Sequence, residues 1–104
     1  MENKFRIILL RGIEDFIFDL LPDDQDKISG AIEALSNKKF DSVYIKQLRG
    51  DIKELKVKKY RLIFFIHEEI VYFLSIFIKK TNKTPQNEID MAEKNYKLIT
   101  NQKL

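Results

Sequence analysis

The first third of the chain changes from a strand pattern to a helical pattern. Residues 5–10 form a short apolar run bounded by charge, which predicts a strand. After Gly12, apolar residues recur at helical spacing with acidic residues between them, and predict an amphipathic helix that ends before Pro22. A second helix follows, with Asp23 or Asp24 as its N-cap. Its apolar stripe consists of Ile28, Ala31, Ile32 and Leu35.

The middle of the chain follows a period of two. After a polar connection, Glu54 and Lys56 alternate with apolar neighbours, which predicts a half-buried strand. Residues 60–66 and 70–78 are dense in Ile, Val, Phe and Tyr, and predict two further strands joined by a tight turn at 67–69. Three consecutive strands of this kind predict an antiparallel meander.

A basic connector, residues 79–83, separates the last strand from a terminal helix. Thr84 is expected as the N-cap of this helix and Pro85 as its first residue. The predicted order is β-α-α-β-β-β-α, an α+β fold with helices packed against a small, mostly antiparallel sheet. Residues 1–104 are expected to form a single domain.

Composition narrows the class of protein. Of the 104 residues, 44% are hydrophobic and 34% are charged, which is typical of one globular domain. Since the chain has no cysteine, disulfide frameworks, thiolate nucleophiles and cysteine-based zinc sites are excluded, and the cytoplasm is the expected compartment. No apolar run approaches the roughly 18 residues that span a bilayer, so neither a membrane segment nor a signal peptide is expected.

Positive charge is concentrated in the middle of the chain. The net charge is only +3, but residues 38–83 hold 12 Lys or Arg against 5 Asp or Glu. Phosphate contacts supply most of the sequence-independent affinity of proteins for nucleic acids. This distribution therefore favours a polyanion as the partner of the central segment.

Glu54, Lys56 and Arg61 are the strongest candidates for a site. If Lys58 and Lys59 form a two-residue hairpin turn, Lys56 lies directly opposite Arg61. Like charges that face each other across a ladder disfavour folding by roughly a few tenths of a kcal/mol. A bound phosphodiester would reverse the sign of that interaction, and Glu54 shares the face. The alternative is that both cations extend into solvent and Glu54 makes a weak surface bridge.

Lys79, Lys80 and Lys83 form a second cationic group at the end of the last predicted strand. Whether Lys79 or Lys80 turns toward Arg61 depends on the register set by the preceding turn, because a shift of one residue reverses the face. The alternative interpretation is a solvated run of charge.

The remaining candidates carry weaker signals. His67, the only histidine, lies in a predicted turn and is expected to be structural. The chain has no metal-ligand spacing, Gly-rich phosphate loop or Ser-His-Asp order, so no metal or cofactor is expected. Three aromatic side chains would stack on a nucleobase if exposed, namely Tyr44, Tyr60 and Phe77.

Two segments of the chain resemble a known family. L-R-G-D-I-K-E-L-K at 48–56 followed by Y-R-L-I-F-F at 60–65 resembles the central motif of RelE/HigB-type toxins. F-I-K-K-T-N-K-T-P at 77–85, followed by Glu88, Ile89 and Ala92, is similar to the signature of the phage-derived, HigB-like branch of the RelE/ParE superfamily. The resemblance covers nearly the whole chain and implies a RelE-like fold.

The resemblance implies a toxin of a type II toxin-antitoxin system, which enters the ribosomal A site and cleaves messenger RNA without a metal. In this family the ribose 2′-hydroxyl attacks the adjacent phosphate. The implied roles are a general base for Glu54 and stabilisation of charge on the phosphorane for Lys56 and Arg61. Lys79 or Lys80 would bind phosphate. Lys56 stands where this branch usually has arginine.

The implied partners are the ribosome with its messenger RNA and a cognate antitoxin, HigA-like with a helix-turn-helix domain, in a hetero-oligomer. Two alternatives stay open. A ParE-like toxin shares the scaffold and poisons gyrase but lacks the nuclease residues. A catalytically inactive module would use the basic face only to dock on nucleic acid or on a partner.

Overall fold

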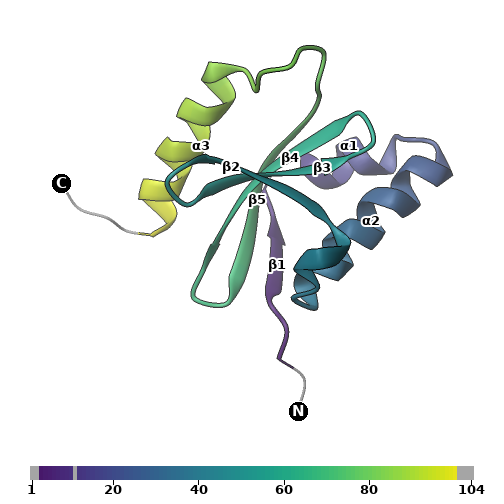
Figure 1. The fold of residues 1–104 in the computed structure, drawn as a ribbon, viewed down its shortest axis with the longest axis horizontal. Helices are drawn as coiled ribbons and strands as arrows, with labels where there is room; N and C mark the ends of the chain where they lie inside the picture. Colours follow the sequence, from purple (N-terminus) through teal and green to yellow (C-terminus); the bar gives the residue numbers. More distant parts are fainter. Residues whose placement is uncertain (1–2, 11, 101–104) are drawn as a thin grey trace.

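Five strands form one sheet with helices on both of its faces (Figure 1). The computed structural model describes residues 3–10 and 12–100. In chain order the elements are β1 (Arg6–Leu9), α1 (Ile13–Phe18), α2 (Pro22–Ser36), the short 3-10 helix η1 (Phe40–Ser42), β2 (Tyr44–Arg49), β3 (Ile52–Val57), β4 (Tyr60–His67), β5 (Ile70–Ile78) and α3 (Gln86–Ile99). The strand order in the sheet is β1-β5-β4-β3-β2.

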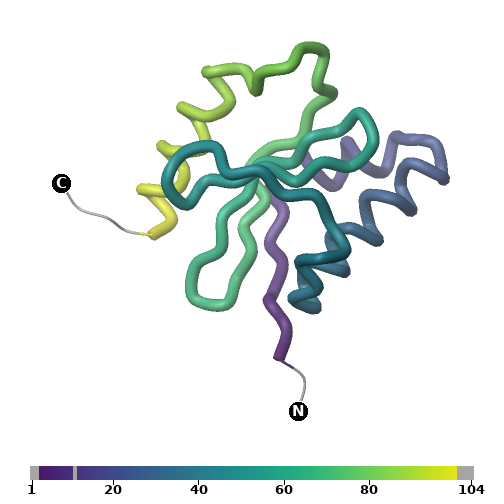
Figure 2. Tube along the Cα trace, viewed as in Figure 1, coloured from purple at the N-terminus to yellow at the C-terminus, as the bar shows by residue number. Residues whose placement is uncertain are grey.

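Strands β2 to β5 form an antiparallel meander, and β1 pairs in parallel with β5. The parallel pairing requires a long crossover, which the chain makes through α1, α2 and three strands (Figure 2). β1 and β2 are therefore the two edge strands. The register between β4 and β5 shifts by one residue between Ile63 and Phe64, which marks a β-bulge in β5.

The sheet buries apolar side chains on both faces. One cluster packs α1 and α2 against the sheet and includes Ile13, Ile28, Leu35, Leu55, Leu62 and Phe73. The other packs α3 against the opposite face and includes Ile52, Ile63, Phe65, Leu74 and Ala92. Because successive strand residues point to opposite faces, β3 contributes Leu55 and Val57 to the first cluster and Ile52 to the second. Glu54 and Lys56 follow Ile52 on the α3 face.

The predicted α+β class, with helices on a mostly antiparallel sheet, is confirmed. The predicted element order was wrong in one respect, because β2 was read as a polar connection. This strand has only one paired edge, and its side chains are half-buried or exposed, so it lacks the apolar alternation of a core strand. None of the described helices has the length and apolarity needed to cross a bilayer.

The predicted capping residues were also wrong. α2 begins at Pro22 itself, with Leu21 as N-cap, so Asp23 and Asp24 lie in the first turn, where carboxylates complement the helix dipole. α3 begins at Gln86, with Pro85 as N-cap. Thr84 uses its hydroxyl elsewhere, in the site described below.

Candidate active site

Glu54 is the only buried polar or charged residue among those that the structure describes, with 2% of its surface exposed. Strand alternation places it on the α3 face of β3, beside the apolar cluster that contains Ile63. A carboxylate is costly to remove from water unless charges or hydrogen bonds compensate it. The contacts of Glu54 therefore show how its charge is compensated and what it is able to bind.

Two cations and a hydroxyl surround the Glu54 carboxylate. Arg61 Nε lies 3.8 Å from Oε1, and Lys79 Nζ lies 3.7 Å from the same oxygen. The Thr84 hydroxyl donates a hydrogen bond to Oε2. Neither cation is within hydrogen-bonding distance of Oε1, so within the described chain this oxygen keeps its lone pairs for another donor.

Arg61 is fixed by the backbone of the β3–β4 turn. Its Nη1 donates to the carbonyl oxygens of Lys58 and Tyr60, each at 2.9 Å. Lys58 and Lys59 form the predicted two-residue turn, in which Lys58 has a left-handed φ of 54°. The guanidinium therefore lies at the mouth of the site in one orientation before any ligand arrives.

A cluster of side chains ties this turn to the start of α2. Lys58 forms ion pairs with Asp24 and with Asp23, the latter at 3.1 Å, and the Tyr60 hydroxyl donates to Asp24 at 2.7 Å. The hydrogen bonds from Lys58 and Tyr60 lower the pKa of Asp24. The Asp24 carboxylate in turn raises the pKa of Tyr60, and hydrogen bonds to Asp24 and Asp23 raise that of Lys58. These contacts stabilise the turn that holds Arg61.

The predicted pairing of Lys56 with Arg61 across β3 and β4 is confirmed, so both cations share the face of Glu54. All three line a pocket of about 260 Å³ together with Lys79. Tyr44 and Lys46 of β2 complete the wall, because β2 pairs Tyr44 with Lys56 and Lys46 with Glu54.

Lys79 and Lys80 have different environments. Lys79 lies against Glu54, with its side chain 10% exposed, whereas Lys80 is exposed. The bulge in β5 decides this, because it pairs Phe77 with Arg61 and so puts positions 77 and 79 on the face of the site. Without that extra residue the alternation would put Lys80, and not Lys79, on this face.

The structure separates the other sequence candidates. His67 is the last residue of β4, six positions from Arg61. Tyr60 is 2% exposed, and Phe77 packs against the apolar cluster under α3, so neither ring is free to stack on a base. Tyr44 is 77% exposed and lies at the rim of the pocket.

Sequence reasoning missed Lys46, which lines the pocket, and the role of Thr84, which hydrogen-bonds to Glu54. Lys46 was overlooked because β2 was not recognised as a strand, so nothing indicated that it pairs with Glu54. Thr84 was read as a helix cap, although its hydroxyl meets Glu54, which lies 30 positions away in the chain. The sequence carried no signal of this hydrogen bond, because the burial of Glu54 that requires a partner is seen only in the structure.

The pocket combines one carboxylate with four cationic side chains, from Lys46, Lys56, Arg61 and Lys79. This excess of positive charge suits an anionic ligand, and Arg61 offers planar donors that match a phosphate. The carboxylate oxygen Oε1 can accept a proton from a hydroxyl group beside that phosphate. No group of His, Cys, Asp and Glu within residues 3–10 and 12–100 has the arrangement needed to hold a metal ion.

Comparison with known proteins agrees with the fold. A chain of the archaeal RelE–RelB complex from Pyrococcus horikoshii OT3 is similar in structure, with a TM-score of 0.60, 12% identity and coverage of 72% of this chain and 94% of that one. A chain of the toxin–antitoxin complex RelBE2 from Mycobacterium tuberculosis gives a TM-score of 0.56, 15% identity and coverage of 73% and 99%.

Sequence comparison identifies the family. No curated protein matches the chain. The family model described as phage derived protein Gp49-like (DUF891), however, matches residues 15–97, which include every residue of the pocket. The chain therefore belongs to the phage-derived Gp49-like family, and its fold is that of the RelE toxins.

Proposed function

We propose that this protein is the toxin of a type II toxin-antitoxin system and that it cleaves messenger RNA in the ribosomal A site. The observation that carries the proposal is the buried Glu54 carboxylate, which lines a cationic pocket and whose Oε1 has two cations beside it but accepts no hydrogen bond from the described residues. The Gp49-like family and the fold shared with chains of toxin–antitoxin complexes support it.

The proposed reaction is an intramolecular transesterification of RNA. The ribose 2′-oxygen attacks the adjacent phosphorus, its proton passes to Glu54 Oε1, and the bond from phosphorus to the 5′-oxygen breaks. The products are a 2′,3′-cyclic phosphate and a 5′-hydroxyl, whose oxygen takes a proton from water. Arg61, Lys79 and Lys56 stabilise the charge on the phosphorane, and each such donor contributes roughly 3 kcal/mol in comparable sites.

The ribosome supplies what the small pocket lacks. The pocket, with a volume of about 260 Å³, is small relative to an RNA chain. Holding the message in the A site would bring the ribose into line for attack, since orientation alone accounts for a large part of many rate enhancements. We accordingly propose that the protein acts in the cytoplasm on translated messages.

The proposed antitoxin is a HigA-like protein with a helix-turn-helix domain that binds the toxin in a hetero-oligomer. Its gene is expected beside the toxin gene. Co-expression should restore the growth of cells that produce the toxin.

The test is induced expression with mapping of the 5′ ends of cellular messages. The wild-type protein is expected to stop growth and to cut a reporter message only when that message has a functional start codon. Arg61→Ala should abolish both effects, while Lys97→Ala, which removes an exposed cation of α3, should abolish neither. Toxicity of a folded Arg61→Ala protein, or cleavage of the untranslated message at the same rate, would overturn the proposal.

A further inference from the structure

A second pocket adjoins the candidate active site. It has a volume of about 390 Å³ and lies between α2, the start of β2 and the end of β3. Two of its lining residues, Tyr44 and Lys56, also line the active-site pocket. The two hollows are therefore neighbours on either side of the Tyr44–Lys56 pair, which is the terminal pair of the β2–β3 ladder at the edge of the sheet.

The pair between the two pockets includes an exposed aromatic ring. Tyr44 is 77% exposed and pairs with Lys56 across β2 and β3. Among the described residues its hydroxyl has no hydrogen-bond partner and its ring has no aromatic neighbour. An aromatic ring left in water beside a cation is a stacking platform for a nucleobase.

The α2 side of the second pocket is formed by Gly30, Ala31 and Ala34. Gly30 lies in the interior of a 15-residue helix, where glycine is disfavoured relative to alanine. A Cβ at Gly30 would meet no atom within 4 Å, so packing inside the protein does not require glycine there. The missing side chain instead leaves space in the pocket.

The charge around the second pocket suits RNA. Its ionisable lining residues are Lys27, Lys56 and Lys58, and no carboxylate lines it. Lys58 is occupied by Asp23 and Asp24, whereas Lys56 is exposed between the two pockets. A flat, neutral group would fit against Gly30, Ala31 and Ala34, and a phosphate attached to it on the side of Arg61 would pair with the cations.

We propose that this second pocket is a nucleobase subsite. The scissile phosphate would bind among Arg61, Lys79 and Lys56, and the base of the adjoining nucleotide would stack on Tyr44 and lie against α2 at Gly30. This inference rests on the proposed function, because it assigns a further part of the same RNA substrate. Since stacking accepts every base, the subsite favours binding with modest sequence preference.

NMR titration of the full chain with inorganic phosphate and with AMP tests the subsite directly. Phosphate is expected to shift the signals of Arg61 and Lys79 but not the α2 amides of Gly30 and Ala31. AMP is expected to shift both groups, because its base reaches the second pocket. The proposal is overturned if AMP shifts only the residues that phosphate shifts, or if it leaves the α2 amides unchanged.

Matched variants refine the test. Tyr44→Ala should weaken AMP binding about tenfold, as expected for loss of one stacked base, and Tyr44→Phe should keep it within about twofold. Gly30→Leu should weaken AMP binding to the level of phosphate, because the leucine side chain fills the pocket. Leucine favours helices more than glycine does, so the variant should keep its melting temperature, which excludes unfolding as the cause. Ser29→Leu adds the same side chain at the next position of α2, outside this pocket, and should leave AMP binding unchanged.

The outcomes separate this inference from the proposed function. If neither phosphate nor AMP shifts the NMR signals of Arg61 and Lys79, the proposed phosphate site is wrong. In that case a shift of the α2 amides by AMP would still support the base subsite, and no shift would overturn it. If the wild-type protein cleaves translated messages and Tyr44→Ala and Gly30→Leu cleave at the same sites and rates, the subsite is wrong and the proposed function stands.

Discussion

At the scale of single residues, the contacts of the Glu54 carboxylate decide how the pocket is interpreted. Arg61 and Lys79 both approach Oε1 of Glu54 without forming a hydrogen bond, while Thr84 holds Oε2. An ion pair that served stability alone would gain most from direct contact. Here the carboxylate and both cations instead line a pocket of about 260 Å³, which has room for a phosphate group.

The residues of the site were predictable to different degrees. Alternation along β3 and the two-residue turn were enough to put Glu54, Lys56 and Arg61 on one face. The register confirms that Lys56 pairs with Arg61. The choice between Lys79 and Lys80 was not predictable, because it depends on a bulge in β5 that has no glycine or proline to mark it.

A pair of adjacent substitutions tests this choice. Lys79→Ala is expected to lower the rate of cleavage on the ribosome by about 100-fold, because a cation of the phosphate site is lost. Lys80→Ala removes the same charge from the exposed neighbour and should change the rate by less than about threefold. Single-turnover kinetics with programmed ribosomes measure both, and the reverse order of effects would show that the register assignment is wrong.

Glu54→Gln separates the chemical role of the carboxylate from a structural one. Glutamine keeps the shape and can still accept from Thr84, but it cannot take a proton from the 2′-hydroxyl. We expect cleavage to slow by about 100-fold while the affinity for ribosomes, measured by co-sedimentation, is retained. Loss of ribosome binding together with a lower melting temperature would instead mean that Glu54 is structural.

At the scale of elements, the β3–β4 turn matters most because it holds Arg61. Lys58 and Tyr60 attach this turn to Asp24 at the start of α2. The apolar strands β3, β4 and β5 and the two long helices, α2 and α3, could be predicted from the periodicity of their apolar residues. β2 could not, because an edge strand with polar side chains resembles a loop in sequence.

The contacts of Asp24 predict how stability depends on pH. Hydrogen bonds from Lys58 and Tyr60 lower the pKa of Asp24 in the folded state below its ordinary value of 3.8. Its stabilising contribution is therefore complete above pH 3.8 and is lost as the pH falls further, through the folded-state pKa. Asp24→Asn should lower the urea midpoint at neutral pH, and the difference from wild type should shrink as the pH falls below 3.8.

The control for this measurement is Asp26→Asn, which changes an exposed carboxylate of the same helix. It should shift the urea midpoint little at either pH. A difference between Asp24→Asn and wild type that stays constant down to the lowest pH would mean that the Asp24 contacts contribute nothing through ionisation.

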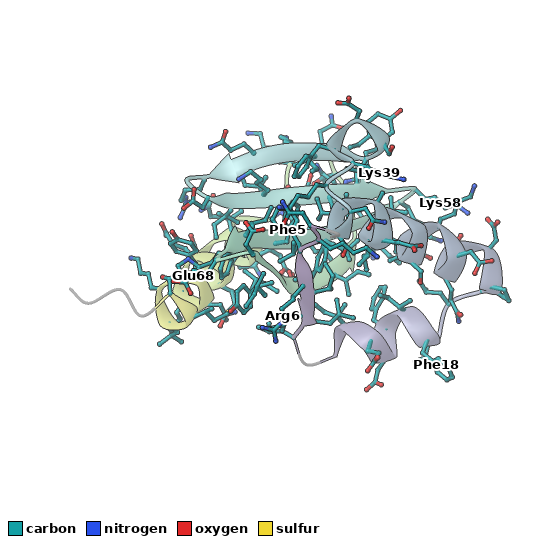
Figure 3. The ribbon with its side chains drawn as sticks, turned by 90° about the horizontal axis from the view of Figure 1, so that it is seen from below. Phe5, Arg6, Phe18, Lys39, Lys58 and Glu68 are labelled. Carbon is teal, nitrogen blue, oxygen red and sulfur yellow. The ribbon has the colours of Figure 1, made fainter. Side chains whose placement is uncertain are left out.

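At the scale of the whole molecule, acidic and basic residues are concentrated in different elements. Residues 12–36, which include α1 and α2, carry seven Asp or Glu and one Lys, whereas residues 38–83 carry the cationic excess. In Figure 3, Phe18 at the end of α1 lies at the bottom of the view and Lys58 of the β3–β4 turn lies above it. RNA would therefore be attracted to the side of β2, β3 and β4 and repelled from α1.

Salt dependence measures this division. The affinity for a single-stranded RNA should fall with salt, and the slope of log K against log salt should decrease by about 0.7 for each phosphate contact removed. Lys46→Gln and Lys56→Gln together should reduce the slope by about 1.4. Lys94→Gln and Lys97→Gln, which change exposed cations of α3, should leave it unaltered. Equal effects from both pairs would contradict a localised RNA surface.

The central claim is that the pocket around Glu54 and Arg61 promotes attack by a ribose 2′-hydroxyl on a message held in the ribosome. The most direct measurement uses ribosomes programmed with a message that carries one 2′-deoxynucleotide at the scissile position in the A site. The wild-type protein should cleave the all-ribose message and leave a 2′,3′-cyclic phosphate, and it should not cleave the substituted one. Cleavage of both messages at equal rates, or of the all-ribose message by Arg61→Ala at the wild-type rate, would contradict the account.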